Sequence, residues 1–263
     1  HDSVMYPLNT DALDLRVVNA TIYNNKITSY DDAIVIKPCD QSGFYCKCAG
    51  DVLAYNNSVS YSTGLTIGSI SASPNVQCVR NVTFRDSSLF RPLKAIYIKP
   101  NSPKDSDEGT GVVDGITYEN IYVEQAVWWT IWIGPQQMNQ PGDEASKGCN
   151  FLYPFIPVCP TQPLISVTNV HLRNITAVDT LPLFEGPGVV LCDAETPCTG
   201  FEFSDVTNTM FNAIPFHIPE VIFPTPFRSD DWEFQYIMDN VYGEVTNSVP
   251  APCVSKDCFN PAS

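Results

Sequence analysis

A segment of about nine residues recurs six times along the chain and constrains its fold more than any other feature. Each copy begins with a small or polar residue, alternates apolar and polar side chains, and passes a polar pair before a further apolar run. The copies read NATIYNNKI, DVLAYNNSV, NVTFRDSSL, GITYENIYV, NVHLRNITA and GFEFSDVTN, starting at residues 19, 51, 81, 115, 169 and 200. The starts lie 30 to 34 residues apart, except for one interval of 54 residues that contains an insertion over about residues 136–163. Repeats of this length built from short strands indicate a solenoid.

Most copies are followed by a second apolar strand. These strands read DDAIVIKP, GLTIGSI, KAIYIKP, WTIWIGP and LPLFEGP. Leucine-rich repeats are disfavoured because their Leu/Asn ladder is missing, and propeller blades because they need four strands per unit. We therefore expect an all-β, right-handed parallel β-helix, in which coils stack ~4.8 Å apart and equivalent residues line up on one face.

The repeat also predicts how the solenoid is finished. Apolar positions should fill the bore, and the Asn residues of the YNN and ENI motifs should occupy a turn and satisfy backbone groups of neighbouring coils. Residues 1–209 are expected to form the coils, and residues 210–263, rich in proline and aromatic side chains, to form a C-terminal cap. The first repeat starts almost at once, so the N-terminal coil should expose unpaired backbone groups.

Cysteines and glycosylation motifs predict a secreted, extracellular protein. The ten cysteines suit an oxidising compartment, and without a CxxC pair we expect no metal site and no cofactor. Local bridges are plausible at Cys192–Cys198, Cys149–Cys159 and Cys253–Cys258, although spacing leaves the connectivity open. Sequons for N-glycosylation begin at Asn19, Asn56, Asn81 and Asn174. No signal peptide is visible and the chain begins at His1, so we expect a processed or partial product.

The net charge restricts the partners. A formal charge of −15 opposes binding to nucleic acid or to an anionic membrane, which carry the same sign. The longest apolar candidate, AVWWTIWIG, is too short for the ~20 residues that cross a bilayer. Its tryptophans Trp128, Trp129 and Trp132 suit stacking on sugar rings, but alternation predicts that at least one of them fills the bore.

Four stretches together resemble the polygalacturonases of glycoside hydrolase family 28. They are PLNTDALDL from Pro7, SYDDAIVIKP from Ser29, STGLTIGSIS from Ser62 and KAIYIKP from Lys94. The family carries an NTD, a DD, a G-H-G before a serine- and glycine-rich strand, and an R-I-K, in this order and at nearly this spacing. The resemblance covers about residues 8–209. It implies a polysaccharide substrate, and it also implies that this chain lacks the N-terminal coils of the family.

Three carboxylates are the candidate catalytic residues. Asp11 and the pair Asp31–Asp32 fall in consecutive coils, so stacking should bring them into one patch. Inverting hydrolysis of a glycoside needs an acid and a base roughly 6.5–9.5 Å apart. Crowded carboxylates repel one another, which raises the pKa of at least one and keeps it protonated. The resemblance implies that Asp31 is the general acid and that Asp11 and Asp32 hold the attacking water.

Two departures from the family pattern concern substrate binding. Thr63 stands where the family has the histidine of G-H-G, and threonine does not titrate near neutral pH. Tyr97 replaces the arginine of R-I-K, whose planar fork grips a carboxylate with two hydrogen bonds. Lys99 remains, with Lys94 nearby. We therefore expect low activity on plain polygalacturonate, or a less acidic substrate.

Two functions remain open at this point. The first is a secreted polygalacturonase-like glycosidase that hydrolyses a pectin-type or related polysaccharide by inversion, with altered or weak activity. The second is a non-catalytic β-helix that serves as an extracellular structural, assembly or glycan-binding protein. An open N-terminal coil would offer a docking surface for the protein's own N-terminal fragment or for another chain.

Overall fold

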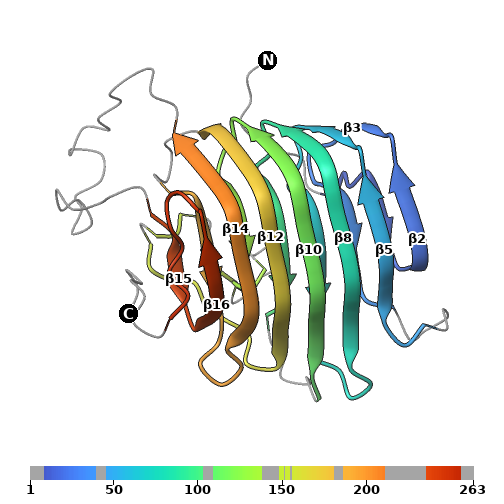
Figure 1. Cartoon of the computed structure of the whole chain (residues 1–263). Coiled ribbons are helices and arrows are strands. Elements are labelled where there is room, and N and C mark those ends of the chain that lie inside the picture. Colours follow the sequence, from blue (N-terminus) through green and yellow to red (C-terminus); the bar gives the residue numbers. More distant parts are fainter. Residues whose placement is uncertain are drawn as a thin grey trace.

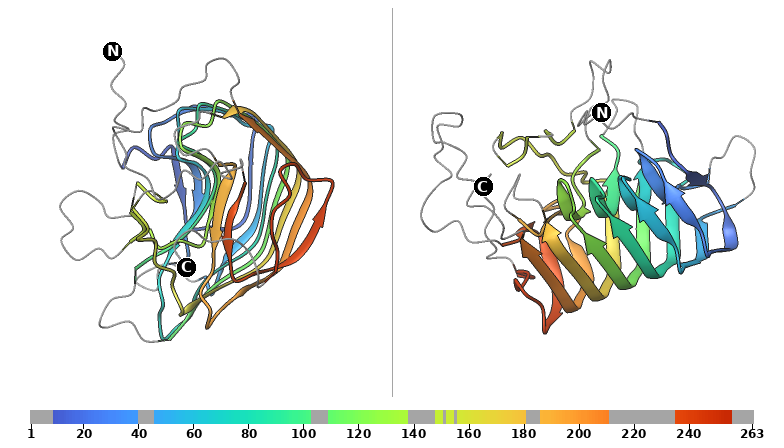
Figure 2. Two further views of the ribbon diagram at one scale, coloured as in Figure 1. Left: turned by 90° about the vertical axis from the view of Figure 1, so that its left-hand side faces the viewer. Right: turned by 90° about the horizontal axis from the view of Figure 1, so that it is seen from above.

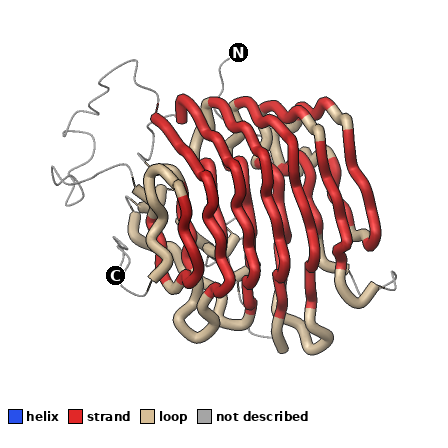
Figure 3. Tube along the Cα trace, viewed as in Figure 1, coloured by secondary structure: helices blue, strands red, loops and turns tan. Residues whose placement is uncertain are grey.

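A computed structural model describes most of the chain. The described ranges are 9–39, 46–102, 109–137, 148–150, 152–154, 156–180, 186–210 and 235–255. The regular secondary structure of the described residues consists of β-strands alone (Figure 3). None of these residues belongs to a helix able to span a bilayer. The all-β class expected from the repeat is confirmed.

The strands form two parallel sheets that wind around a common bore (Figures 1 and 2). Sheet A has seven strands, in the order β1 (Leu13–Leu15), β4 (Asp32–Ile36), β7 (Gly64–Ile70), β9 (Lys94–Pro100), β11 (Trp129–Ile133), β13 (Gly188–Leu191) and β15 (Ile237–Asp239). Sheet B contains β2 (Val18–Tyr23), β5 (Ala49–Tyr55), β8 (Gln77–Phe90), β10 (Gly111–Glu124), β12 (Ile165–Thr180), β14 (Cys198–Met210) and β16 (Val241–Thr246). In the same sheet β6 (Ser58–Ser60) pairs with β8, and β3 (Lys26–Thr28) pairs with β6. The chain alternates between the sheets, as the right-handed parallel β-helix predicted from the sequence requires.

The polar residue that opens each sequence copy is a corner of the coil. At residues 19, 51, 81, 115, 169 and 200 the backbone has φ between 50° and 69°. Five residues further on, at Asn24, Asn56, Asp86, Asn120, Asn174 and Asp205, φ lies between 49° and 58°. Glycine, asparagine and aspartate tolerate this left-handed conformation better than other residues do. The repeat therefore encodes bends as well as strands.

Corner side chains bond from coil to coil. The side chain of Asn56 donates through Nδ2 to Asn24 Oδ1 at 2.6 Å. Next to it, Asn57 Oδ1 accepts the backbone N–H of Asn25 at 3.1 Å, and Asn57 Nδ2 donates to the carbonyl of Ile22 at 3.3 Å. The YNN asparagines thus occupy the predicted turn, where one satisfies neighbouring backbone and the other bonds its own counterpart.

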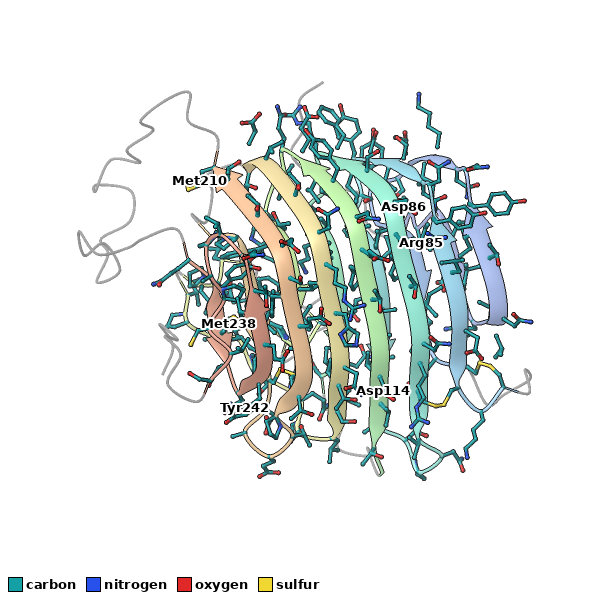
Figure 4. All side chains as sticks on the ribbon, viewed as in Figure 1. Arg85, Asp86, Asp114, Met210, Met238 and Tyr242 are labelled. Carbon is teal, nitrogen blue, oxygen red and sulfur yellow. A yellow bond between two sulfur atoms is a disulfide. The ribbon has the colours of Figure 1, made fainter. Side chains whose placement is uncertain are left out.

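The same corner carries exposed charge on the outside of sheet B. Asp86 accepts a hydrogen bond from Asn120 Nδ2 at 2.8 Å. Arg85 lies beside it on β8, with Nη1 3.1 Å from Asp86 Oδ2 (Figure 4). Both charged side chains are at least 39% exposed, so this ion pair adds little stability.

The bore is filled by apolar rows that run across the strands of sheet A. One row joins Ile34, Leu65, Ile96 and Ile131 in register, and each is at most 1% exposed. A second buried cluster lies on the outer face of sheet A, away from the bore. It contains Tyr97, Trp128, Trp129, Trp132, Cys149, Tyr153, Val189, Leu191 and Ile237. The three tryptophans belong to this second cluster and not to the one that fills the bore.

The positions of three strands in the C-terminal part were not predicted from the sequence. A strand was expected at LPLFEGP, residues 181–187; Gly186 and Pro187 lie outside any strand, and β13 begins at Gly188. Residues 181–185 are outside the described ranges. Within the segment expected as a cap, β15 pairs with β13 and β16 pairs with β14, which continues both sheets.

Four disulfides lie among the described residues. They join Cys39 to Cys46, Cys48 to Cys78, Cys149 to Cys159, and Cys192 to Cys198. The last two are among the local bridges considered from spacing and are confirmed. The third candidate involves Cys258, which lies outside the described residues.

Candidate active site

The three candidate carboxylates meet where sheet A begins. Asp11 precedes β1, Asp31 immediately precedes β4, and Asp32 is the first residue of β4. The two coils are stacked in parallel and are joined here by a hydrogen bond from the N–H of Ala12 to the carbonyl of Asp32, at 2.9 Å. One carboxylate oxygen from each aspartate lies within 4.8 Å of the others. The patch predicted from the repeat therefore exists, and its nearest oxygens are closer than the separation typical of an inverting pair.

Asp32 is buried and saturated with hydrogen-bond donors. Its Oδ1 accepts from Thr63 Oγ1 at 2.5 Å and from Thr66 Oγ1 at 2.7 Å, and its Oδ2 lies 2.6 Å from Lys99 Nζ. Burial raises the pKa of Asp32, but the charge of Lys99 and these three hydrogen bonds outweigh it and lower the pKa below its ordinary value. Asp32 is an anchored anion.

Asp31 is half-buried and held by backbone. Its Oδ2 accepts the N–H of Asn9 at 2.7 Å, and its Oδ1 accepts the N–H of Asp32 at 2.9 Å. Thr63 Oγ1 lies 3.3 Å from the same Oδ1. The carboxyl is thus oriented by the chain itself while part of its surface stays open to solvent.

Asp11 is the member of the group whose environment favours a bound proton. Burial and the negative charges of Asp31 and Asp32 raise its pKa, and the cations Lys37 and Lys99 only partly oppose this. Lys37 Nζ lies 3.8 Å from Asp11 Oδ2 and also pairs with Asp14. The cluster therefore retains a proton at a higher pH than an isolated aspartate would.

Thr66 is a site residue that was not predicted from the sequence, whereas Thr63 was predicted. Thr63 occupies the histidine position of the resemblance and bonds Asp32 directly, so it supports the carboxylate without titrating. Thr66 lies on β7 between Leu65 and Ile67, which both face the bore. A polar side chain at the alternate position of a buried strand must find a partner, and this parity was the available signal.

Tyr97 is enclosed with two lysines. The Nζ atoms of Lys94 and Lys99 lie 3.7 Å and 5.1 Å from the centre of its ring. Burial and the charges of Asp32 and Asp31 raise the pKa of the Tyr97 phenol well above its ordinary value. Tyr97 is therefore a neutral, packed side chain and offers no charge to a substrate.

Lys94 was noted only as a neighbour of the motif, yet it lies in an aromatic cage. Its Nζ is 4.7 Å from the ring centres of both Trp128 and Trp132, in addition to its contact with Tyr97. The residue is 1% exposed. Burial and repulsion by Lys99 lower the pKa of Lys94 well below its ordinary value. The surrounding rings keep this amine away from solvent.

The match to a family model decides the relationship of this chain. The model of glycosyl hydrolases family 28 matches residues 2–213. The chain belongs to this family. The matched range contains all three aspartates as well as Thr63, Tyr97 and Lys99.

Curated relatives in family 28 are similar to about three quarters of the chain. The probable exopolygalacturonase X of Aspergillus terreus is 23% identical, over 76% of this chain and 43% of its own length. Endopolygalacturonase AN8327 of Emericella nidulans is 27% identical, over 76% of this chain and 45% of its own length. This chain therefore spans less than half the length of these relatives.

A solved structure has the same fold. The crystal structure of endo-xylogalacturonan hydrolase from Aspergillus tubingensis superposes with a TM-score of 0.58 at 17% identity. The match covers 98% of this chain and 56% of that chain. The parallel β-helix is thereby common to both proteins.

Proposed function

We propose that this chain carries the catalytic carboxylates of a polygalacturonase-like glycosidase that hydrolyses a pectin-type or related polysaccharide. The observation that carries the proposal is the meeting of Asp11, Asp31 and Asp32 within 4.8 Å at the start of sheet A. Membership of family 28 supports the same reaction class.

In the proposed reaction Asp31 is the general acid. It gives its proton to the glycosidic oxygen as the C–O bond breaks, and water adds to the sugar carbon from the opposite face, which inverts its configuration. Inversion is proposed from the family resemblance and not from the spacing of the carboxylates, which is shorter than that of a typical inverting pair. Asp11 and Asp32 hold this water, and Asp11 in its ionised form takes the proton, since its raised pKa makes it a stronger base than an ordinary aspartate. Asp11 is better placed to contact it, because both oxygens of Asp32 already accept bonds from Lys99 and two threonines.

The proposed substrate is less acidic than plain polygalacturonate. Tyr97 offers no charge, and the cation next to it, Lys94, is enclosed by aromatic rings. Lys99 is 7% exposed and committed to Asp32. A galacturonate carboxylate would therefore meet few available donors, so activity on plain polygalacturonate should be weak.

We also propose that the protein is secreted and glycosylated. Its disulfides fit an oxidising compartment. The sequon residues Asn19, Asn56, Asn81 and Asn174 are all exposed at coil corners, where an attached glycan would extend into solvent.

A second candidate function is a non-catalytic assembly module. It is favoured by the N-terminal edge, where β1 and β2 each pair on only one side within the described structure. Val18 and Tyr23 on this edge are 47% and 52% exposed. Its occupant would be the protein's own N-terminal fragment or another chain, added by strand pairing.

Product analysis separates the two functions. The protein from its native source is incubated with polygalacturonate, rhamnogalacturonan and neutral glycans, beside Asp31→Asn and the charge-matched control Asp14→Asn. We expect cleavage that Asp31→Asn abolishes and Asp14→Asn retains. If no glycan is cleaved at high protein concentration, the assembly function replaces the enzymatic one. Rapid cleavage of plain polygalacturonate would contradict the proposed substrate preference.

A further inference from the structure

One register row of sheet A runs from the candidate site to the far end of the sheet. It joins Thr66, Tyr97, Trp132, Val189 and Ile237 on successive strands. The first member donates to the anchored carboxylate of the site. From Tyr97 onward, the row belongs to the second buried cluster, and no member is more than 5% exposed.

Part of the insertion lies over this row. The described residues 148–150, 152–154 and 156–160, here called the cover segment, lie on the side of sheet A away from sheet B (yellow-green in Figure 2). Tyr153 is fully buried, and its ring meets Trp132 edge-on with 6.4 Å between centroids. Cys149 belongs to the same cluster, and Cys159 packs against it.

The cover segment is fastened to the sheet at several points. Its ends are joined by the Cys149–Cys159 disulfide. The N–H of Gln136, just after β11, bonds the carbonyl of Pro160 at 3.0 Å, and the N–H of Cys149 bonds the carbonyl of Gln136 at 3.2 Å. A sugar could reach the row from Tyr97 to Ile237 only by displacing a buried tyrosine and these contacts.

A polysaccharide bound at the carboxylates therefore meets a closed surface in one direction. Across β11, β13 and β15 the outer face of sheet A is filled with protein side chains. On the β1 side of the site, the described side chains of Asp11, Lys37 and Asp14 are 18%, 22% and 38% exposed. A long glycan bound at the carboxylates therefore cannot continue along sheet A toward β11.

We propose that the cover segment makes the site accept the end of a glycan chain, so that sugars are removed from one terminus and not from the interior. This inference rests on the proposed hydrolase function and adds its mode of action. Tyr97 marks the boundary, because it is the first residue of the row that lies in the covered cluster. The named relatives include both exo- and endo-acting enzymes, so their names leave the mode open.

Two measurements test the proposal. In the first, products from the substrate that the wild-type protein cleaves are sized over time. We expect the shortest product alone from the earliest samples, with viscosity falling far more slowly than reducing ends appear. A mixture of long oligosaccharides with rapid loss of viscosity would overturn the proposal while leaving the hydrolase function intact.

In the second, binding to Asp31→Asn is measured with oligogalacturonides and neutral pectic oligosaccharides that carry a fluorophore at either the reducing or the non-reducing end. We expect one of the two labels to weaken binding at least about tenfold, because that terminus must enter the closed side. Equal binding of both would overturn the proposal. One-sided binding without hydrolysis would support the closed end and reject only catalysis, whereas no binding would reject both.

Variants of the cover segment provide the direct control. Tyr153→Ala, and separately Cys149→Ser with Cys159→Ser, should increase the share of long products and reduce the difference between the two labels. The matched control is Tyr122→Ala, which removes a tyrosine that is 43% exposed on sheet B. If both cover variants unfold at the wild-type denaturant midpoint and keep the wild-type product pattern, the segment does not set the mode of action.

Discussion

Lys99 Nζ lies 2.6 Å from Asp32 Oδ2, in an ion pair whose two side chains are 9% and 1% exposed. The two residues are 67 positions apart and are brought together by the stacking of β4, β7 and β9. Because each charge has lost most of its water, the pair binds the coils to each other and fixes the anion at the centre of the site.

Lys99→Met should destabilise the protein strongly. The change leaves the Asp32 charge buried without its cation, which typically costs about 3–5 kcal/mol. Denaturant unfolding measures the loss, and adding Asp32→Asn to Lys99→Met should recover part of it. Lys37→Met is the control, since its ion pairs are more exposed and should contribute less than about 1 kcal/mol. Equal losses for the two lysine variants would contradict the buried-pair interpretation.

Acid should weaken the native state through Asp32. Its native pKa is lowered because the charge and hydrogen bonds around it outweigh the effect of burial. A carboxyl of this kind stabilises the fold above its unfolded pKa and loses that contribution as the pH falls through the native pKa. We therefore expect the free energy of unfolding to decline below about pH 4.

The check is the slope of the free energy of unfolding against pH. Asp32→Asn should have a shallower slope in the acid range than the wild-type protein. Asp86→Asn, which removes an exposed charge from the outside of sheet B, should keep the wild-type slope. The interpretation fails if the slope is the same in all three proteins.

An arginine at position 97, where the resemblance to the family implies one, should not provide a substrate grip. Tyr97→Arg would place a third cation beside Lys94 and Lys99 in a buried cluster, at a cost of about 3–5 kcal/mol. Tyr97→Arg combined with Lys94→Met should be more stable than Tyr97→Arg alone. Thermal unfolding and hydrolysis of polygalacturonate are measured together, with Tyr122→Arg as an exposed control. A stable Tyr97→Arg protein with raised activity would show that the cluster tolerates the charge.

The corner at Asn120 should separate backbone strain from side-chain bonding. Its φ is 53°, its Nδ2 bonds Asp86, and its Oδ1 accepts from Asn174 at 2.8 Å. Asn120→Gly keeps the conformation but loses the bonds, whereas Asn120→Ala loses both and should cost about 1–2 kcal/mol more. Denaturant unfolding of the two variants gives the difference. Equal stability would mean that the corner conformation is not the limiting factor.

The fold was largely readable from sequence because its determinants are local. Alternating apolar residues specify strands whatever lies far away, and asparagine, aspartate and glycine specify corners through their tolerance of positive φ. The register was readable too, since each coil is one repeat. For that reason the meeting of Asp11, Asp31 and Asp32 followed from counting residues.

The environment of the site did not follow from counting. The sequence could not tell that Lys99 is committed to Asp32, that Thr66 completes the anchoring, or that Lys94 lies within a cage of aromatic rings. The position of β13 at Gly188–Leu191 was likewise not predicted from the sequence. These outcomes depend on which side chains are buried together. Burial in turn depends on the packing of many residues that are far apart in the sequence.

The sequence by itself determined the coil, its corners, its family resemblance and the identity of the three carboxylates. Only the tertiary structure decided which carboxylate is buried, which lysines remain available, and which part of sheet A lies under the cover segment. The physical reason is that strand and bend preferences act over a few neighbouring residues. Burial, ion pairing and surface coverage arise only when residues far apart in the chain are packed together.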